Sequence, residues 1–438
     1  MCEQQGLLAG FGKVDVTPDY PVGLRGYSTD ATRIHEMVVD PIYVTCIALT
    51  EGEETILIYT LDHCCCDQTI TQWIREAVTP VTGIPGEKIF TSATHTHSAP
   101  STGAHPNAMR YRGDLVVWCV QAAQAALADR APAKVLVAKQ EVPRMNFVRH
   151  FITANGSIAG IAFGSFKDNP PVDYTAQPDK TLMLVKFQRE GLKKSILMVN
   201  WQGHPDRSSE IGKLNIAPSF PGPLRDTLAN YTGDLVAYFT GADGNTVIDS
   251  RLKQDQHDLN WREYGIKMAE IGYGLYKQLQ EVPGTGIVVN RRVVELETDH
   301  GMDHRIEDAL KVIEFWKKEG LTEGMAYARS LGFSSVYQAN AIRNKYNMGK
   351  TRTLELNTFR VGGIGFTSGT YEMFSEAGLA IRERSPFENT FLLTGNFSYI
   401  PSKEAYDYQC YEAVTGYFAR GTGEYLVEQY LEMLKEIQ

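Results

Sequence analysis

The fold is indicated by the stretch Tyr43-Val44-Thr45-Cys46-Ile47-Ala48-Leu49-Thr50-Glu51-Gly52-Glu53-Glu54-Thr55-Ile56-Leu57-Ile58-Tyr59-Thr60-Leu61. In it, two runs rich in β-branched and aromatic residues flank a polar turn that contains glycine. Such runs are typical of β-strands, because these side chains pack well on a pleated surface. Residues 69–78 then have a helical pattern, and residues 88–93 predict another strand. Strands that alternate with helices indicate an α/β fold.

The same alternation continues along the chain. Strands are predicted at 134–142, 181–188, 195–201, 235–239, 287–296, 353–361, 362–366 and 391–396. Helices are predicted at 115–128, 261–281, from about 372 onward and at 422–437. Residues 303–347 are heavily helical and charged, which predicts an insertion. Because the sequence contains no repeat or low-complexity linker, we predict one α/β, mixed-sheet, layered catalytic domain over 1–438, with a helical insertion at 303–347.

The composition argues against several classes of function. The chain has 438 residues, of which 43% are hydrophobic, and a net charge of −9 without a long basic run. Nucleic acid is therefore not an expected partner. No apolar run reaches the roughly 20 residues of a transmembrane helix. Residues 1–9 lack a positively charged leader region, which favours a cytoplasmic location unless a leader has been removed. The sequence leaves open whether the chain forms a homo-oligomer.

Seven cysteines are present, and Cys64, Cys65 and Cys66 are adjacent. Neighbouring strand residues point to opposite faces, so this run does not predict a disulfide framework, and its spacing differs from that of structural zinc sites. We predict buried, reduced thiols and therefore a reducing compartment. A cysteine hydrolase is disfavoured, because the sequence has no nucleophile signature for one.

Histidines follow two of the predicted strands. One segment is Thr91-Ser92-Ala93-Thr94-His95-Thr96-His97-Ser98-Ala99-Pro100, and the other is Asn200-Trp201-Gln202-Gly203-His204-Pro205. In an extended segment His95 and His97 project on the same side, and imidazole is the commonest metal ligand. Open α/β sheets bind ligands at the carboxyl ends of their strands. We expect His95 and His204 to share a metal site there, although each alone could be an ordinary loop histidine.

Two later segments carry further polar side chains that could take part in chemistry. Glu372 lies where a glycine-rich strand opens into a helix predicted to begin near it, so it could equally be a helix cap or dipole partner. Tyr399 lies on a segment stiffened by Pro401, and its alternative role is that of a core tyrosine.

Together these segments resemble the catalytic domain of the neutral/alkaline non-lysosomal ceramidase family. The matching pieces are Phe11-Gly12-Lys13-Val14-Asp15-Val16-Thr17-Pro18 with Gly26-Tyr27, Thr94 to Pro100, Asn200-Trp201 with His204, Gly369-Thr370-Tyr371-Glu372, and Asn396 to Pro401. Two departures are clear. Only two residues separate Trp201 from His204, and Gly241-Ala242-Asp243-Gly244-Asn245-Thr246 lacks the serine of the family's corresponding stretch.

The resemblance implies one zinc ion per chain, bound by His95, His204, Glu372 and Tyr399. It implies that His97 acts beside the metal and the substrate. It further implies that Arg149, in Met145-Asn146-Phe147-Val148-Arg149-His150, binds a substrate oxygen, and that Asp62 takes part in catalysis.

We therefore expect a zinc-dependent hydrolase that cleaves an amide or ester bond by metal-activated water. Because of the departures, and because no extended apolar segment offers a lipid channel, we expect a smaller or more polar substrate than ceramide. One alternative is a metal-dependent lyase or glycoside-cleaving enzyme acting on a carbohydrate derivative. Another is a non-catalytic protein that binds metal or carbohydrate.

Overall fold

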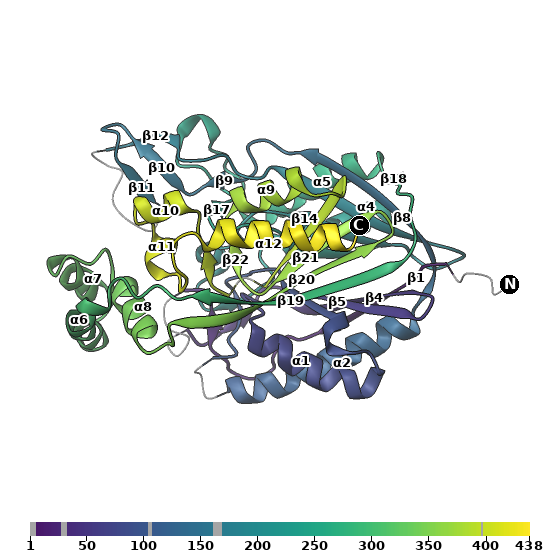
Figure 1. The fold of residues 1–438 in the computed structure, drawn as a ribbon, viewed down its shortest axis with the longest axis horizontal. Helices are drawn as coiled ribbons and strands as arrows, with labels where there is room; N and C mark the ends of the chain where they lie inside the picture. Colours follow the sequence, from purple (N-terminus) through teal and green to yellow (C-terminus); the bar gives the residue numbers. More distant parts are fainter. Residues whose placement is uncertain (1–5, 28–32, 104–106, 161–168, 396) are drawn as a thin grey trace.

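The computed structural model describes residues 6–27, 33–103, 107–160, 169–395 and 397–438. Two β-sheets pack face to face, and helices cover their outer faces (Figure 1). The predicted fold class, a layered α/β domain with a mixed sheet and a helical insertion, is confirmed.

The larger sheet has nine strands in the order β16-β14-β13-β8-β1-β4-β5-β6, with β18 paired to β8. Most neighbours are antiparallel, but β5 runs parallel to β6 and β14 runs parallel to β16. The strands are β1 (Leu8–Asp15), β4 (Tyr43–Glu51), β5 (Glu54–Leu61), β6 (Ile89–Ala93), β8 (Ala131–Glu141), β13 (Thr181–Arg189), β14 (Ile196–Trp201), β16 (Leu235–Thr240) and β18 (Gln280–Glu281).

The smaller sheet packs its inner face on the larger one. Its order is β19 (Ile287–Glu297), β20 (Thr351–Val361), β21 (Ile364–Gly369) and β23 (Asn389–Thr394), with β21 and β23 parallel. Phe90 of the larger sheet stacks on Phe359 at a ring-centroid distance of 4.2 Å, and Phe359 stacks on Phe366 at 4.6 Å. These rings lie in the apolar core between the two sheets.

Helices complete the layers. The outer face of the larger sheet packs against α1 (Gln68–Thr82), α2 (Ala108–Ala128), α4 (Pro221–Thr232) and α5 (Trp261–Tyr276). The smaller sheet packs against α9 (Ser375–Arg384) and α12 (Thr422–Glu436). The segment between β19 and β20 forms α6 (Ile306–Glu319), α7 (Leu321–Ser330) and α8 (Val336–Tyr346), which have their own small core and project from one end (Figure 1).

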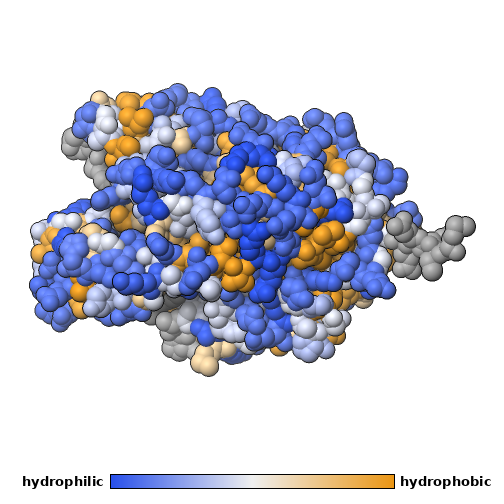
Figure 2. All heavy atoms as spheres, in the orientation of Figure 1, coloured by the Kyte–Doolittle hydropathy of each residue, from blue (hydrophilic) through white to orange (hydrophobic). Residues whose placement is uncertain are grey.

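Local sequence signals explain where several helices begin and end. Asn260 and Glu263 form a capping box at the start of α5, which satisfies backbone N–H groups that have no helical partner. The Asp67 side chain caps α1, and Gly83 ends it at a φ of 74°. The face seen in Figure 2 is mostly polar, with apolar residues in separate patches. Among the described residues, no helix is both long and apolar enough to cross a membrane.

The two ends of the larger sheet approach each other and the smaller sheet. Strands β16 and β6 are at opposite ends of the sheet order, yet both contact β23 and each other. Hydroxyl groups link them: Thr240 Oγ1 donates to the Thr94 carbonyl at 3.0 Å, and Ser92 Oγ donates to the Thr394 carbonyl at 2.9 Å. The carboxyl ends of strands from distant parts of the chain therefore lie together.

Three local predictions are wrong. The helix predicted over 261–281 ends at Tyr276, because Gln280 and Glu281 pair with the edge of β8. The helix expected near Glu372 begins at Ser375, because Glu372 lies in the short strand β22 (Glu372–Met373), which pairs with β24 (Tyr399–Ile400). His95 is not extended but has a φ of 66°. Asn396, the predicted end of a strand, lies outside the described residues.

The close contact between β1 and α2 gives a test of the packing. A Cβ atom added at Gly12 would lie 2.1 Å from the Ala122 carbonyl oxygen. We expect Gly12→Ala to lower the free energy of unfolding by about 1–3 kcal/mol, because the strand and helix must separate. Gly113, exposed within α2, meets nothing within 4 Å and is the matched control. Gly113→Ala should raise stability by up to about 1 kcal/mol in chemical denaturation; similar effects of both substitutions would contradict this packing.

Candidate metal centre

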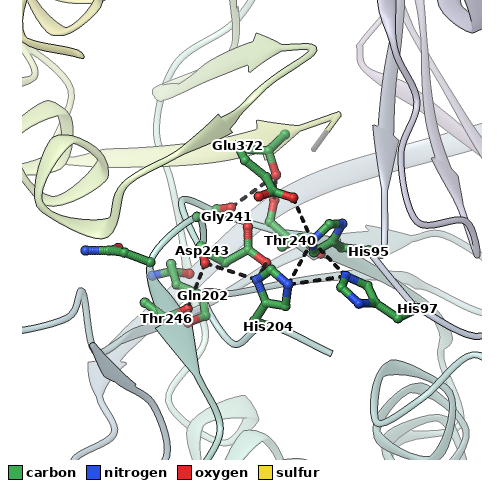
Figure 3. A network of polar contacts seen from close by, with 12 residues as sticks. His95, His97, Gln202, His204, Thr240, Gly241, Asp243, Thr246 and Glu372 are labelled. Carbon is green, nitrogen blue, oxygen red and sulfur yellow. Dashed lines mark hydrogen bonds and ion pairs between the residues drawn. The ribbon is translucent and has the colours of Figure 1, made fainter. Parts of the chain in front are cut away.

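Three imidazole rings meet at the carboxyl ends of the strands. The Nε2 atoms of His95 and His204 are 3.1 Å apart, those of His97 and His95 are 3.4 Å apart, and those of His204 and His97 are 3.3 Å apart. Glu372 Oε1 lies 2.8 Å from the same His95 nitrogen. Figure 3 shows the three rings and the carboxylate turned toward one common point. The predicted convergence of His95, His204 and Glu372 is present in the structure.

The hydrogen bonds behind the rings determine what these nitrogens can offer. His95 Nδ1 is hydrogen-bonded to the Cys64 carbonyl oxygen, so this nitrogen holds a proton. When a cation replaces the second proton of the ring, Nε2 presents a lone pair to it. His204 Nδ1 faces the Asp243 carbonyl oxygen at 3.4 Å and the Asp243 carboxylate at 3.6 Å. Lone pairs this close repel each other unless a proton or a cation lies between them. The arrangement is therefore suited to a positive ion.

The spacing of the donor atoms agrees with a zinc-type ion. A tetrahedral ion with bonds of about 2.0–2.1 Å holds its nitrogen ligands roughly 3.3 Å apart. The Nε2 atoms of the two predicted histidine ligands, His95 and His204, are close to this separation at 3.1 Å. Glu372 Oε2 and both carboxylate oxygens of Asp243 are buried without a hydrogen bond to any described residue. Buried carboxylate oxygens are normally paired or bound to a metal, so the chemistry of this donor set fits a divalent cation.

The protonation of the cluster follows from its burial. Burial lowers the pKa of His95, but the Glu372 carboxylate and the Cys64 carbonyl raise it by more, so the pKa is well above its usual value. Burial, and then the positive charge on His95, lower the pKa values of His97 and His204 well below the usual one. Burial also raises the pKa of Asp243 to about 7. The protonated His95 ring therefore carries one positive charge next to the Glu372 carboxylate, at the place where a cation would also be held.

The backbone around His95 is unusual for this residue type. A positive φ is uncommon outside glycine, and such conformations cluster at functional sites. The turn bends the chain between Thr94, which is tied to β5 and β16, and Thr96, whose hydroxyl donates to the Ala217 carbonyl at 2.8 Å. His95 and His97 therefore reach one point without the extended geometry that we had expected.

Arg149 belongs to a second, largely buried network beside the histidines. It follows β9 (Phe147–Val148), which pairs with β17 (Thr246–Val247). Its Nε donates to Glu412 Oε1 at 2.5 Å, and its Nη2 donates to the Gly244 carbonyl oxygen at 2.8 Å. Glu412 also accepts from His150 at 2.8 Å. Burial raises the pKa of Glu412, but Arg149 and His150 outweigh it and hold that pKa far below its usual range. Although His150, Cys410 and Glu412 have metal-ligand spacing, the guanidinium already neutralises this carboxylate.

Tyr399 lies beside Glu372, directly opposite it in the parallel pairing of β22 and β24. Its ring faces Arg149, whose guanidinium carbon lies 5.5 Å from the ring centroid. Within the described chain it has no hydrogen bond to the three histidines, so its role as a ligand stays a prediction.

Asp62 is held in an ion pair away from this cluster. Both carboxylate oxygens accept from the Arg225 guanidinium at 3.0 Å, and one also accepts from the Tyr43 backbone N–H at 2.9 Å. Asp62 and Arg225 are buried. In the described chain the structure does not bring the Asp62 carboxylate into contact with the imidazoles.

Sequence reasoning missed two residues of this centre. Asp243 follows β16 at the same sheet edge as the histidines, so its position after a strand was a usable signal. Glu412 lies on α11 (Tyr411–Thr415), and no local pattern links it to Arg149, which is far away in the sequence.

No model of a known protein family matches the sequence, and no curated protein matches it. Among solved structures, this fold is similar to that of ceramidases. The crystal structure of neutral ceramidase from Pseudomonas aeruginosa gives a TM-score of 0.74 at 17% identity, covering 99% of this chain and 75% of that chain. The structure of a ceramidase complexed with C2 gives a TM-score of 0.72 at 15% identity, covering 99% of this chain and 76% of that chain. The resemblance found in the sequence is confirmed for the fold.

The buried pair of Asp62 and Arg225 gives a second test. We expect Asp62→Asn to lower the free energy of unfolding by about 3–5 kcal/mol, because Arg225 would keep an uncompensated buried charge. The matched control is Glu428→Gln, which removes an exposed carboxylate from a similar pair with Arg384 and should change stability little. Chemical denaturation measures the free energy of unfolding of both variants. A large loss of bound metal per folded molecule in Asp62→Asn, without a loss of stability, would instead place Asp62 in the centre.

Proposed function

We propose that this chain is a zinc-dependent hydrolase that cleaves an amide or ester bond at the centre formed by His95, His204 and Glu372. The observation on which this depends is the convergence of imidazole nitrogens and a carboxylate at the spacing of a tetrahedral ion. The ceramidase-like fold supports the same proposal. Tyr399, opposite Glu372, is the proposed fourth ligand. When bound, the ion supplies Lewis acidity and a nucleophilic water at neutral pH.

The protein side chains would then position and protonate the substrate. His97 is proposed as the proton-transfer residue, because its Nε2 faces the cluster and its ring is uncharged. Its ring packs edge-on against Tyr27, and it is 7% exposed, more than either of the other two histidines. Arg149 is proposed to bind the substrate oxygen that gains negative charge. Its guanidinium keeps its charge, because Glu412 and Tyr399 raise its pKa by more than burial lowers it.

The proposed substrate is smaller or more polar than ceramide. The charged groups around the centre, Arg149 and Glu412 among them, are better suited to polar groups of a substrate than to a long hydrocarbon chain. Hydrolysis of a panel of small polar amides and esters, beside a short-chain ceramide, tests this part. Turnover of ceramide alone would contradict it.

Metal analysis tests the centre directly. We expect about one equivalent of zinc in the wild-type protein and a large loss in His95→Ala and in His204→Ala, because each change removes a ligand. His300→Ala is the control, since His300 contacts Asp303 and Thr298 and should leave the metal content unchanged. Undiminished metal in both ligand variants would refute the proposal.

Substitution of His97 should reduce catalysis without reducing metal binding. We expect His97→Ala to retain zinc but to lose about 10²–10⁴-fold in kcat, the usual contribution of a proton-transfer residue. Metal loss equal to that of His95→Ala would make His97 a ligand instead. Reaction in ¹⁸O-labelled water completes the test, because hydrolysis must place solvent oxygen in the acid product whereas a lyase need not. Bound metal with no turnover on any substrate would favour a binding protein.

A further inference from the structure

A thiol lies directly beside the histidine cluster. Cys64 follows β5, and its carbonyl oxygen is the acceptor for His95 Nδ1. The Cys64 sulfur and one nitrogen each of His95 and His97 lie within 4.8 Å of one another, and all three residues are buried. The group of His95, His204 and Glu372 shares only His95 with it. Two sets of metal-ligand type are therefore adjacent.

The donor atoms of the two sets differ in chemical character. A carboxylate and imidazoles suit zinc and harder divalent ions, whereas a thiolate selects soft, thiophilic cations such as zinc or cadmium over magnesium or calcium. His97 also has a second ring nitrogen that could bind a cation, because its Nδ1 is buried without a hydrogen bond to any described residue. An imidazole nitrogen beside a thiol is a common pair of ligands in zinc sites.

We propose that Cys64 and His97 supply the protein ligands of an accessory site for a second thiophilic divalent cation. This site lies next to His95, whose Nδ1 is hydrogen-bonded to the Cys64 carbonyl and whose Nε2 belongs to the first centre. Binding forms a bond between the Cys64 sulfur and the cation, and the thiol proton is released to solvent. The inference rests on the proposed function in one respect: a cation held by His97 prevents that residue from transferring protons, so excess zinc or cadmium inhibits the enzyme.

The neighbouring cysteines provide matched controls. Cys65 and Cys66 are buried like Cys64, but neither belongs to a group of ligands in the described chain. Cys66 instead contacts Thr71, with 3.7 Å between the sulfur and the hydroxyl oxygen. A substitution at Cys65 therefore tests for general effects of altering this buried run.

Titration of the metal-free protein with cadmium tests the proposal. We expect about two equivalents to bind, with sulfur-to-cadmium charge-transfer absorption in the ultraviolet and release of a proton. In Cys64→Ser the absorption should vanish and affinity for the second cadmium should fall by more than about 100-fold, beyond the cost of losing a supporting contact. Cys65→Ser should behave like the wild type. Inhibition by excess cadmium, measured relative to each variant's own uninhibited rate, should weaken only in Cys64→Ser.

A measurement on the wild-type protein covers the case in which Cys64→Ser does not fold. Saturating cadmium should protect Cys64 from alkylation in mildly denatured protein, as mapped by mass spectrometry, and leave Cys65 and Cys66 reactive. Binding of one cadmium without sulfur absorption would overturn the accessory site while leaving the proposed hydrolase centre intact. Binding of no cadmium would overturn both. Sulfur absorption that persists in Cys64→Ser would overturn the assignment to this thiol.

Discussion

The centre of this protein depends on electrostatic repulsion that only a positive charge can relieve. Three imidazole nitrogens lie within 3.4 Å of one another in a buried site, and a carboxylate lies beside them. Without a cation, a single proton between His95 and Glu372 has to balance the cluster, and the other two rings are held neutral. A divalent ion bound by His95, His204 and Glu372 would relieve this repulsion, which is why metal binding should also contribute to folding stability.

The sheet architecture makes this meeting of side chains possible. Strand ends that lie far apart in the sheet order are joined by hydroxyl-to-carbonyl hydrogen bonds, such as that from Thr240 to Thr94. Rigid strands hold the first residues of each loop, and short loops hold the ligands. The positive φ of His95 costs free energy that the surrounding hydrogen bonds must offset, as is common where a ligand has to be aimed.

A second buried network supports the first. Glu412 fixes Arg149 and His150, and Arg149 reaches Tyr399, which pairs with the strand of Glu372. Because the buried Glu412 carboxylate is hydrogen-bonded to both Arg149 and His150, it can hold the guanidinium close to the metal centre. The Asp243 backbone carbonyl lies behind His204 at 3.4 Å from its Nδ1, the place of an acceptor that orients a metal-binding histidine.

The sequence by itself determined the class of fold and the main donors. Alternating strands and helices are recorded in local side-chain patterns, and His95 and His204 stand directly after strands, so the sheet edge could be predicted. It did not determine the short strand at Glu372, the turn at His95, the pairing of Asp62 with Arg225, or the contacts of Glu412 and Cys64. These depend on segments brought together from far apart in the chain, and only the packing of the two sheets decides which charges and donors become neighbours.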